Sequence, residues 1–253
     1  MKKRLDVLLV ERGLAASRAQ AQALVMAGLV RGHTKAGEQV DDAAPLDVEV
    51  PPPYVSRAGH KLANALDALA VDPRGLDCLD LGASTGGFTD VLLQRGAAGV
   101  IALDVGHGQL HQRLREDPRV VVIERKNARE LESLPLAPQL VVCDVSFISV
   151  RLVLPPALAL AAPGWQALVL VKPQFEAARG EAPKGVVRDP EVQRRVLLEI
   201  VHAALGWGAQ ALGLVDSGLP GTKGNREFVL HLADAVEPKL PADLDRWIVD
   251  ATH

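Results

Sequence analysis

The sequence is poor in aromatic side chains and in cysteine. Aromatic residues make up 3% of its 253 positions, so the core must be built mainly from Ala, Leu and Val. The two cysteines, Cys78 and Cys143, lie inside apolar runs and do not indicate a disulfide scaffold. With 48% apolar residues, 23% charged residues and a formal net charge of -3, the composition is that of a globular protein. It excludes collagen, coiled coil and wholesale disorder.

Segments typical of export or membrane insertion are also lacking. Met1 is followed by basic residues without an apolar block, so a cytoplasmic location is expected. Residues 152–171 carry no charge and are about as long as a bilayer span, but Pro155, Pro156 and Pro163 would interrupt a spanning helix. We expect this stretch to form a buried helix, a turn and a buried strand.

The first 35 residues are basic, although the whole chain is slightly acidic. They carry seven Lys and Arg residues against two acidic residues. Apolar residues at helical spacing predict two short helices, the first ending at Gly13 and the second capped by Ser17. Small strands are expected around residues 29–30, 40 and 46–50. The pattern predicts a small N-terminal module of about fifty residues.

Three prolines at positions 51–53 divide the chain. Such a run favours extended geometry and predicts a semi-rigid spacer. We therefore expect a module at 1–50, a linker at 51–56 and a larger domain at 57–253. In the larger domain, apolar runs alternate with helical segments, which predicts a βαβ series and a mainly parallel sheet. The expected strands are 77–82, 99–104, 119–124, 139–144, 166–172, 209–216 and 227–232, with a long helix over 189–206.

A glycine-rich turn, residues 80–89, follows the first of these strands and opens a helix. Glycines at this place let the backbone approach a ligand, and a helix N-terminus offers unpaired N–H groups. The alternative is a tight turn that binds nothing. The spacing is not that of the dinucleotide fingerprint, and the Gly-Lys-Ser/Thr of a phosphate loop is missing, which argues against ATP or GTP hydrolysis.

Two residues at later strand ends narrow the ligand to a nucleoside. Asp104 ends a strand about twenty residues beyond the glycine-rich turn, where an acid can accept hydrogen bonds from two ribose hydroxyls. Asn127 follows the third strand and could read an adenine edge, although an Asn in a loop is more often a turn residue.

Five motifs closely resemble those of the TlyA-type ribosomal RNA 2′-O-methyltransferases. They are the turn at 80–89, Asp104-Val105-Gly106, Asp144-Val145-Ser146-Phe147, Lys172-Pro173-Gln174-Phe175 and Gly224-Asn225-Arg226-Glu227. Residues 4–31 look like an S4 RNA-binding domain, and the remainder is similar to the FtsJ-like fold. The resemblance implies an α/β class I S-adenosylmethionine methyltransferase with a Rossmann-like, mainly parallel seven-stranded sheet. A small S4-like α+β domain would precede it.

The resemblance also implies roles for individual residues. Those implied at the cofactor are Gly82, Ser84, Gly86, Gly87, Phe88, Asp104, Asn127 and Asp144. Within this set, Asp104 would hold the ribose of S-adenosylmethionine and Asn127 its adenine. The implied catalytic Lys-Asp-Lys-Glu set is Lys61, Asp144, Lys172 and Glu227. Asp144 and Lys172 end adjacent strand candidates, where open α/β sheets bind their ligands; the alternative is that these are solvated strand ends.

The implied catalytic set combines two amines with two carboxylates. Such a combination can activate a weak nucleophile. A ribose 2′-hydroxyl must lose its proton while it attacks a sulfonium methyl group. Lys172 is the candidate base, because the second amine of Lys61 and partial burial both disfavour the charged form of a lysine. Asp144 and Glu227 would fix the two amines by hydrogen bonds, although their charges oppose this effect. Positioning of the reactants can supply about 7–11 kcal/mol.

Phosphates attract cations without regard to sequence, so the basic N-terminal residues predict salt-dependent affinity for RNA. By resemblance, Arg4, Arg12 and Arg18 face RNA in the S4-like module, and the candidates around the catalytic mouth are Arg57, Arg125, Arg129 and Arg179. Residues 173–188 are expected to form either a mobile loop that closes over substrate or an inert surface loop. The expected partners are ribosomal RNA and ribosomal subunits, without a membrane or a metal. The expected target is a cytidine ribose of the large subunit and, as a second substrate, of the small subunit.

Three other functions are open at this point. An amino-methyltransferase is disfavoured, because the Asn/Asp-Pro-Pro-aromatic run typical of that class is replaced by Asp144-Val145-Ser146-Phe147. A membrane-damaging protein is a second alternative, because members of the resembled family have been labelled haemolysins, but no amphipathic or spanning segment supports it. The third is an RNA-binding protein without catalysis. The triproline spacer and the extension at 235–253 depart from the expected family pattern.

Overall fold

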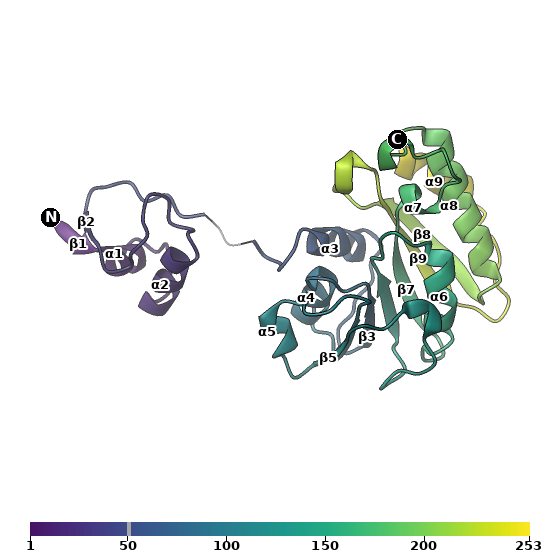
Figure 1. The fold of residues 1–253 in the computed structure, drawn as a ribbon, viewed down its shortest axis with the longest axis horizontal. Coiled ribbons are helices and arrows are strands. Elements are labelled where there is room, and N and C mark those ends of the chain that lie inside the picture. The colour runs from purple at the N-terminus through teal and green to yellow at the C-terminus, as the bar shows by residue number, and fades with distance from the viewer. Residues whose placement is uncertain (50–51) are drawn as a thin grey trace. The chain divides into compact units, whose positions relative to one another are not determined.

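A seven-stranded sheet in the order β5-β4-β3-β6-β7-β9-β8 organises the larger part of the computed structural model, which describes residues 1–49 and 52–253 (Figure 1). The strands from β5 to β7 pair in parallel, and β9 is antiparallel to both of its neighbours. Their bounds are β3 (Asp77–Leu81), β4 (Gly99–Leu103), β5 (Val120–Ile123), β6 (Leu140–Cys143), β7 (Gln166–Val171), β8 (Ala209–Asp216) and β9 (Phe228–Asp234). The predicted α/β class with a mainly parallel seven-stranded sheet is confirmed.

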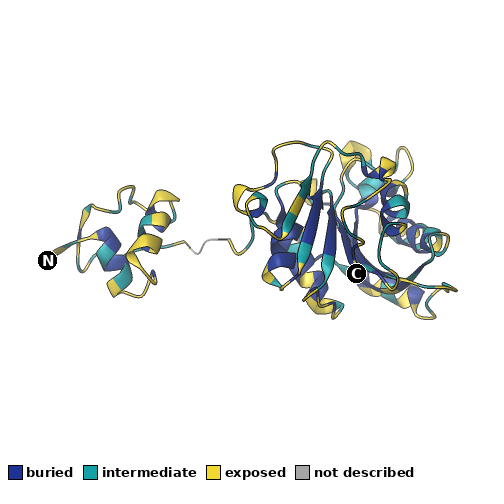
Figure 2. Cartoon of the chain, turned by 90° about the horizontal axis from the view of Figure 1, so that it is seen from below, coloured by how far each residue is buried: buried dark blue, intermediate teal, exposed yellow. Residues whose placement is uncertain are grey.

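Both faces of this sheet are buried under helices. Side chains alternate along a strand, so Val141 and Cys143 of β6 face one apolar cluster while Leu140 and Val142 face the other. The first cluster includes side chains from α6 (Val150–Leu158), α8 (Pro190–Leu205) and α9 (Leu244–Thr252). The second includes side chains from α3 (Ala58–Ala68) and α4 (Gly87–Gln94). The central strands are accordingly buried along most of their length (Figure 2).

Local sequence signals account for several element boundaries. Oδ1 of Asp189 accepts a hydrogen bond from the N–H of Glu191, 2.9 Å away, and Pro190 occupies the first turn of α8, as predicted. The uncharged stretch at 152–171 forms most of α6 and then β7, as expected. Within the described residues, no helix combines the length and the apolar character that crossing a bilayer requires. Shorter elements are α5 (Gln112–Arg115), α7 (Pro173–Glu176), η1 (Ala128–Glu130), η2 (Pro183–Gly185) and η3 (Thr222–Gly224).

The first 53 residues form a separate compact unit. It contains β1 (Lys2–Arg4), α1 (Leu5–Glu11), α2 (Arg18–Met26) and β2 (Gln39–Asp41), and β1 pairs antiparallel with β2. Leu5, Leu8 and Leu9 are buried in its core, and Oγ of Ser17 accepts a hydrogen bond at the start of α2, as predicted.

Strand predictions in this N-terminal unit were partly wrong. Val30 and Val48 form an isolated bridge and not two regular strands. The strand β1 was missed, because its three residues are all basic and show no apolar alternation. Val50, the last residue of one predicted strand, lies outside the described residues.

The second compact unit comprises Tyr54–His253. The N–H of Val55 donates a hydrogen bond of 2.8 Å to Oδ2 of Asp90 in α4. The ring of Tyr54 packs edge to face against that of His60, with the two ring centroids 5.2 Å apart. Residues 54–56, which the sequence analysis placed in the linker, therefore contact the larger unit. Residues 50 and 51, at the predicted boundary, lie outside the described part of the chain.

Candidate active site

The glycine-rich turn between β3 and α4 allows two strand ends to approach closely. Gly82 follows β3 with a φ of 82°, and a Cβ at this position would lie 2.9 Å from the backbone oxygen of Asp144, which follows β6. The positive φ and the short distance to the backbone of Asp144 therefore both favour glycine at position 82. The turn brings the carboxyl ends of β3 and β6 to one place.

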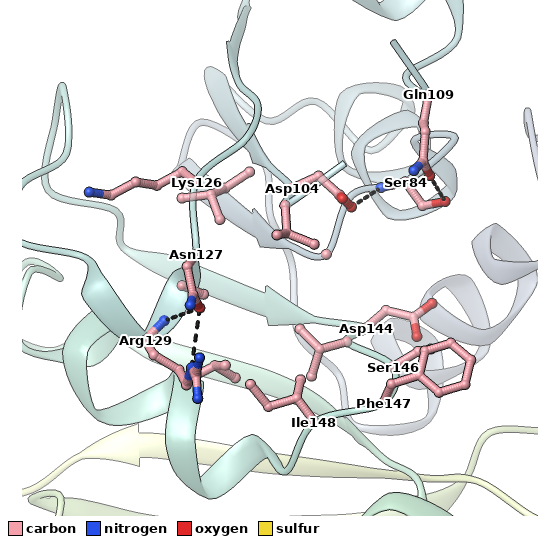
Figure 3. Close-up of a pocket in the computed structure, with 16 residues that line it drawn as sticks. Ser84, Asp104, Gln109, Lys126, Asn127, Arg129, Asp144, Ser146, Phe147 and Ile148 are labelled. Carbon is pink, nitrogen blue, oxygen red and sulfur yellow. Dashed lines mark hydrogen bonds between the residues drawn. The ribbon is translucent and has the colours of Figure 1, made fainter. Parts of the chain in front are cut away.

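Two adjoining pockets open at the carboxyl ends of the parallel strands. The larger pocket, of about 550 Å³, is lined by residues that follow β3, β4, β5 and β6 (Figure 3). The smaller pocket, of about 300 Å³, is lined by the start of α3, the glycine-rich turn and the ends of β6 and β7. Gly82, Ser84, Asp144 and Ser146 line both. This is the edge at which open α/β sheets bind ligands.

Asp104 points its carboxylate toward the glycine-rich turn. Oδ2 accepts a hydrogen bond of 2.8 Å from the N–H of Ser84 (Figure 3). Oδ1 accepts one of 2.6 Å from the N–H of Gly106. An ionised carboxylate has about four acceptor sites, so both oxygens keep capacity for further donors. Because Asp104 lines the larger pocket, this capacity fits the hydroxyls of a ribose.

Asn127 lines the larger pocket, but its amide group is engaged within its own loop. Its Oδ1 accepts a hydrogen bond of 3.1 Å from the N–H of Arg129 at the start of η1 (Figure 3). Its Nδ2 donates one of 3.1 Å to Glu130. The second N–H of Nδ2 is the donor that could serve an adenine edge without displacing these bonds. The structure therefore gives Asn127 the turn role that the sequence left open, beside its place at the pocket wall.

The remaining predicted cofactor residues differ in their access to the pockets. Gly87 and Phe88 line the smaller pocket. Gly86 is found in neither lining set, and a Cβ there would meet the side chains of Leu110 and Leu114 at 2.8 and 2.3 Å. Gly86 thus leaves space for packing between α4 and the α5 region, and the structure does not place it at the pocket wall.

Asp80 is a site residue that the sequence analysis did not single out. Its side chain is fully buried at the end of β3 and lines the smaller pocket. Oδ2 accepts hydrogen bonds from the N–H and the hydroxyl of Thr89, whereas Oδ1 has no hydrogen-bond partner among the described residues. Burial raises the pKa of Asp80 to about 7, and the nearby charge of Asp144 adds to this rise. Oδ1 of Asp80 could therefore accept a hydrogen bond from a positively charged group bound in the pocket.

The four residues of the predicted catalytic set converge from four elements. Nζ of Lys172, after β7, lies 2.6 Å from Oδ1 of Asp144, after β6. Nζ of Lys61, in α3, lies 2.5 Å from Oε2 of Glu227, which precedes β9. Three of the four side chains are less than 13% exposed, and that of Asp144 is 16% exposed. The structure therefore brings together two buried lysine–carboxylate pairs at one edge of the sheet.

The two pairs also act on each other electrostatically. Burial raises the pKa of Asp144 above its ordinary value, while the charges of Lys172 and Lys61 act in the opposite direction. The carboxylate of Glu227 adds to the upward shift. The charges of both pairs therefore act on the carboxyl of Asp144.

Two neighbours restrict the position of Glu227. Nε2 of Gln174 in α7 lies 3.5 Å from its Oε1. A Cβ at Gly221 would lie 1.8 Å from the same oxygen, so the loop between β8 and β9 closes directly on this carboxylate. Neither contact could be inferred from sequence spacing.

Phe147 is a second residue that the sequence analysis named only as part of a motif. It lines the larger pocket, is 90% exposed and adopts a φ of 65°, which is rare for a bulky residue. Its ring centroid lies 5.0 Å from that of Phe175, which follows Lys172 by three positions. The exposed ring of Phe147 thus lies against the half-buried ring of Phe175.

The predicted RNA-binding arginines of the larger unit are all exposed, but only two of them line a pocket. Arg57 lines the smaller pocket and Arg129 the larger one. Arg125 has a φ of 57° and lies two residues before Asn127. Arg179 follows α7.

In the N-terminal unit, the predicted arginines have partners within the unit. Arg4 and Arg18 both contact the fully buried carboxylate of Asp6, each with a nitrogen 3.0 Å from Oδ2. Their side chains stay 46% and 57% exposed. Arg12 donates to the backbone oxygens of Asp42 and Ala44. Arg4 and Arg18 are thus held side by side with about half of each side chain facing solvent.

The loop at 173–188 is tied down, in contrast to the mobile loop expected as one alternative. The amide of Asn225, which is buried, donates to the backbone oxygen of Gly185 and accepts from the N–H of Val187. Nζ of Lys223 donates to the backbone oxygen of Lys184 at 2.9 Å. These bonds join the loop before α8 to the loop before β9.

Comparison with known proteins places these features in context. Residues 54–233 match the model of the FtsJ-like methyltransferase family, and residues 3–31 match that of the S4 domain. The chain is 46% identical to the 16S/23S rRNA (cytidine-2′-O)-methyltransferase TlyA of Mycobacterium tuberculosis, over 99% of this chain and 96% of that protein. It is 38% identical to Hemolysin A of Brachyspira hyodysenteriae, over 90% of this chain and 98% of that protein.

A solved structure is similar as well. The protein comes from Streptococcus thermophilus and is named as a candidate hemolysin. It superposes with a TM-score of 0.76 at 40% identity and covers 99% of this chain and 95% of its own.

Proposed function

Since the chain belongs to the FtsJ-like methyltransferase family and carries an N-terminal S4 domain, we propose that it methylates the 2′-oxygen of cytidine riboses in ribosomal RNA. The large-subunit RNA is the proposed substrate and the small-subunit RNA a second one, as the name of the Mycobacterium tuberculosis relative indicates for that protein. The observation that carries the proposal is the pair of buried lysine–carboxylate contacts, Lys172 with Asp144 and Lys61 with Glu227, beside a nucleoside-sized pocket.

The chain is an S-adenosylmethionine-dependent enzyme, and the residues present fit that cofactor. When bound, S-adenosylmethionine supplies an electrophilic methyl group on a sulfonium. We assign Asp104 to the ribose hydroxyls, because both its oxygens keep acceptor capacity at the larger pocket. We assign Asp80 to the ammonium of the methionine part, because this residue lines the smaller pocket and its buried Oδ1 has no hydrogen-bond partner among the described residues. The methionine part of the cofactor would also be lined by Gly82, Ser84, Gly87 and Phe88.

Lys172 is the proposed base. Its amine accepts the proton of the 2′-hydroxyl as the O–CH₃ bond forms and the S–CH₃ bond breaks, and it later releases this proton to solvent. Asp144 fixes the amine at 2.6 Å and stabilises the ammonium that forms. Lys61, held by Glu227, orients the hydroxyl and adds positive charge near the developing oxyanion.

The exposed ring of Phe147 suits the nucleobase of the target. A ribose within a folded RNA becomes accessible when its nucleotide swings out of the stack, and an unstacked base gains free energy by stacking on an aromatic side chain. Phe147 lines the larger pocket, is packed against Phe175 and presents its ring to solvent, so it is proposed as the stacking platform.

The N-terminal unit would bind RNA through phosphate contacts. Arg4 and Arg18 are fixed by Asp6 and half exposed, which limits the side-chain entropy lost when they bind a phosphate. In the larger unit, Arg57 and Arg129 at the pocket walls, with Arg125 and Arg179, are proposed to contact the RNA near its target. We propose 1–50 as the S4-like domain, and we let the methyltransferase domain begin at Tyr54 in place of the expected 57, because residues 54–56 contact the larger unit. A ribosomal substrate also supports a cytoplasmic location.

The function is tested with Lys172→Ala. The variant is incubated with ribosomal subunits that lack the modification and with S-adenosylmethionine carrying a labelled methyl group, and methylated riboses are mapped in both RNAs. Methylation should be lost, while calorimetric binding of the cofactor stays nearly unchanged. Lys239→Ala, an exposed lysine outside the site, is the control and should retain full activity.

Other outcomes would assign a different function. Wild-type turnover by Lys172→Ala would exclude Lys172 as the base. A wild-type protein that binds RNA and shows no cofactor binding, with or without RNA, would be an RNA-binding module. A methyl group found on a base nitrogen would indicate an amino-methyltransferase.

A further inference from the structure

Ser146 has no role in the catalytic set, yet it contacts the proposed base. It lies two residues after Asp144, in the turn between β6 and α6, and lines both pockets. Its Oγ accepts a hydrogen bond of 2.8 Å from Nζ of Lys172. We infer that Ser146 is a positioning residue, which fixes the direction in which the amine of Lys172 faces the 2′-hydroxyl. This inference rests on the proposed function.

The two partners of the Lys172 amine hold it in different ways. Asp144 lies at ion-pair distance, 2.6 Å, but its Oδ1 has no hydrogen bond of regular geometry among the described residues. Attraction between charges depends on distance and hardly on direction, whereas a hydrogen bond weakens steeply when it bends. Asp144 therefore holds the amine in place, and Ser146 fixes its rotation about the Cε–Nζ bond.

This rotation matters because a neutral amine has a single lone pair. With one N–H bond turned toward Ser146 and the amine held near Asp144, the lone pair has fewer directions open to it. Lys172 is 8% exposed and lines the smaller pocket, so a hydroxyl bound there can meet the lone pair. After proton transfer, the new ammonium keeps both contacts, and Ser146 stabilises its charge as an acceptor.

Several charged groups surround this amine. Asp144 contacts it directly, and Lys61 and Glu227 form the second pair of the set. Asp80 and Arg57 line the same smaller pocket. Loss of the Ser146 hydroxyl should loosen the orientation of the amine while Asp144 still holds it in place. The rate should therefore fall while substrate and cofactor binding stay nearly unchanged, and a hydroxyl restored at position 146 should recover the rate, which a purely structural serine would not produce.

The test compares Ser146→Ala with wild type by methyl transfer to unmodified ribosomal subunits. The expected result is a kcat lower by about ten- to a hundredfold, the loss of one hydrogen bond to a charged group. KM for the subunits and Kd for S-adenosylmethionine should change by less than about twofold. Ser146→Thr keeps the hydroxyl and should recover most of the rate.

The matched control is Ser149→Ala. Ser149 lies three residues later, caps α6 and donates to Glu176, so its loss removes a hydroxyl from the same turn without touching Lys172. Its kcat per folded enzyme should equal that of wild type. Wild-type kcat in Ser146→Ala, or a loss of rate that Ser146→Thr does not repair, would overturn the inference. Ser146→Gly provides a second removal of the hydroxyl if the alanine variant folds poorly.

Failure of the proposed function itself has a different signature. In that case the wild-type protein transfers no methyl group to a ribose, and Lys172→Ala matches it. If wild type methylates and Lys172→Ala does not, the function stands, and the Ser146 variants decide the inference alone.

Discussion

Gly221 leaves no room for a side chain against the carboxylate of Glu227, since a Cβ there would lie 1.8 Å from Oε1. Gly221 has a φ of -74°, which every residue tolerates, so the constraint is space alone. The loop between β8 and β9 therefore helps to set the position of Glu227, and through it that of Lys61.

Gly221→Ala should reduce methyl transfer by at least about tenfold, because Glu227 must move and the amine of Lys61 follows it. Thermal stability should fall by little, since the loop can shift outward. Gly206→Ala, at the end of α8 with a φ of -70° and a Cβ contact of 3.4 Å, is the control and should retain activity. Unchanged kcat in Gly221→Ala would show that Glu227 does not need its present position.

Asp80 predicts a pH dependence of cofactor binding. Burial raises its pKa to about 7, so the carboxyl is neutral below this pH and ionised above it. If the ammonium of S-adenosylmethionine binds the ionised form, Kd should be constant above about pH 7 and rise by up to about tenfold per pH unit below it. Calorimetry across this range measures the profile. Asp80→Asn should bind more weakly and lose this dependence, and a parallel profile in the variant would contradict the assignment.

The same carboxyl affects the stability of the free protein. Between the ordinary value of 3.8 and about 7, folded Asp80 keeps a proton that the unfolded chain has lost. Its contribution to the free energy of unfolding therefore falls as pH rises through this window and is level above it. The difference in unfolding free energy between wild type and Asp80→Asn, measured by denaturant titration at several pH values, should follow this curve. A pH-independent difference would argue against the raised pKa.

RNA binding should depend on Arg4 and Arg18. Because both contact the buried carboxylate of Asp6, charge reversal would place like charges together and destabilise the unit, so glutamine is the better substitution. The double variant should bind RNA more weakly, with a salt slope lower by about 1 to 2. Arg246→Gln in α9, where the side chain is 79% exposed, is the control. An unchanged slope in the double variant would remove these arginines from the interface.

Phe147→Ala should lower kcat/KM for the RNA substrate through the loss of about 1–3 kcal/mol of base stacking. Phe147→Tyr keeps an aromatic face and should recover most of the rate. Leu152→Ala, an exposed apolar residue of α6, serves as the control. Equal activities of the Ala and Tyr variants would contradict a stacking role.

The strand ends at the site could be predicted, because apolar runs end at polar residues that a parallel sheet collects at one edge. Asp104, Asp144 and Lys172 are of this kind, and the structure places each directly after its strand. The contact between Lys61 and Glu227, 166 residues apart, came only from the family resemblance. No periodicity or spacing encodes a contact between a helix before the sheet and the start of the seventh and last strand of the larger unit in chain order.

Other features depend on the packing of the whole fold. The orphaned Oδ1 of Asp80 and the exposure of Phe147 are visible only when every neighbour is placed. The amide of Asn127 could read a base by its chemistry, but hydrogen bonds to Arg129 and Glu130 engage it. The loop at 173–188, for which a mobile loop and an inert surface loop were both open, is hydrogen-bonded to Asn225, a residue whose motif alone did not reveal its partners.

The two backbone donors on Asp104 have a consequence for selectivity among analogues. Since Ser84 and Gly106 already orient the carboxylate, it is preorganised to accept hydrogen bonds from two vicinal hydroxyls before a nucleoside binds. A deoxyribose version of the cofactor would satisfy only one of the two waiting oxygens and should therefore compete poorly, whereas changes on the far side of the sugar should be tolerated.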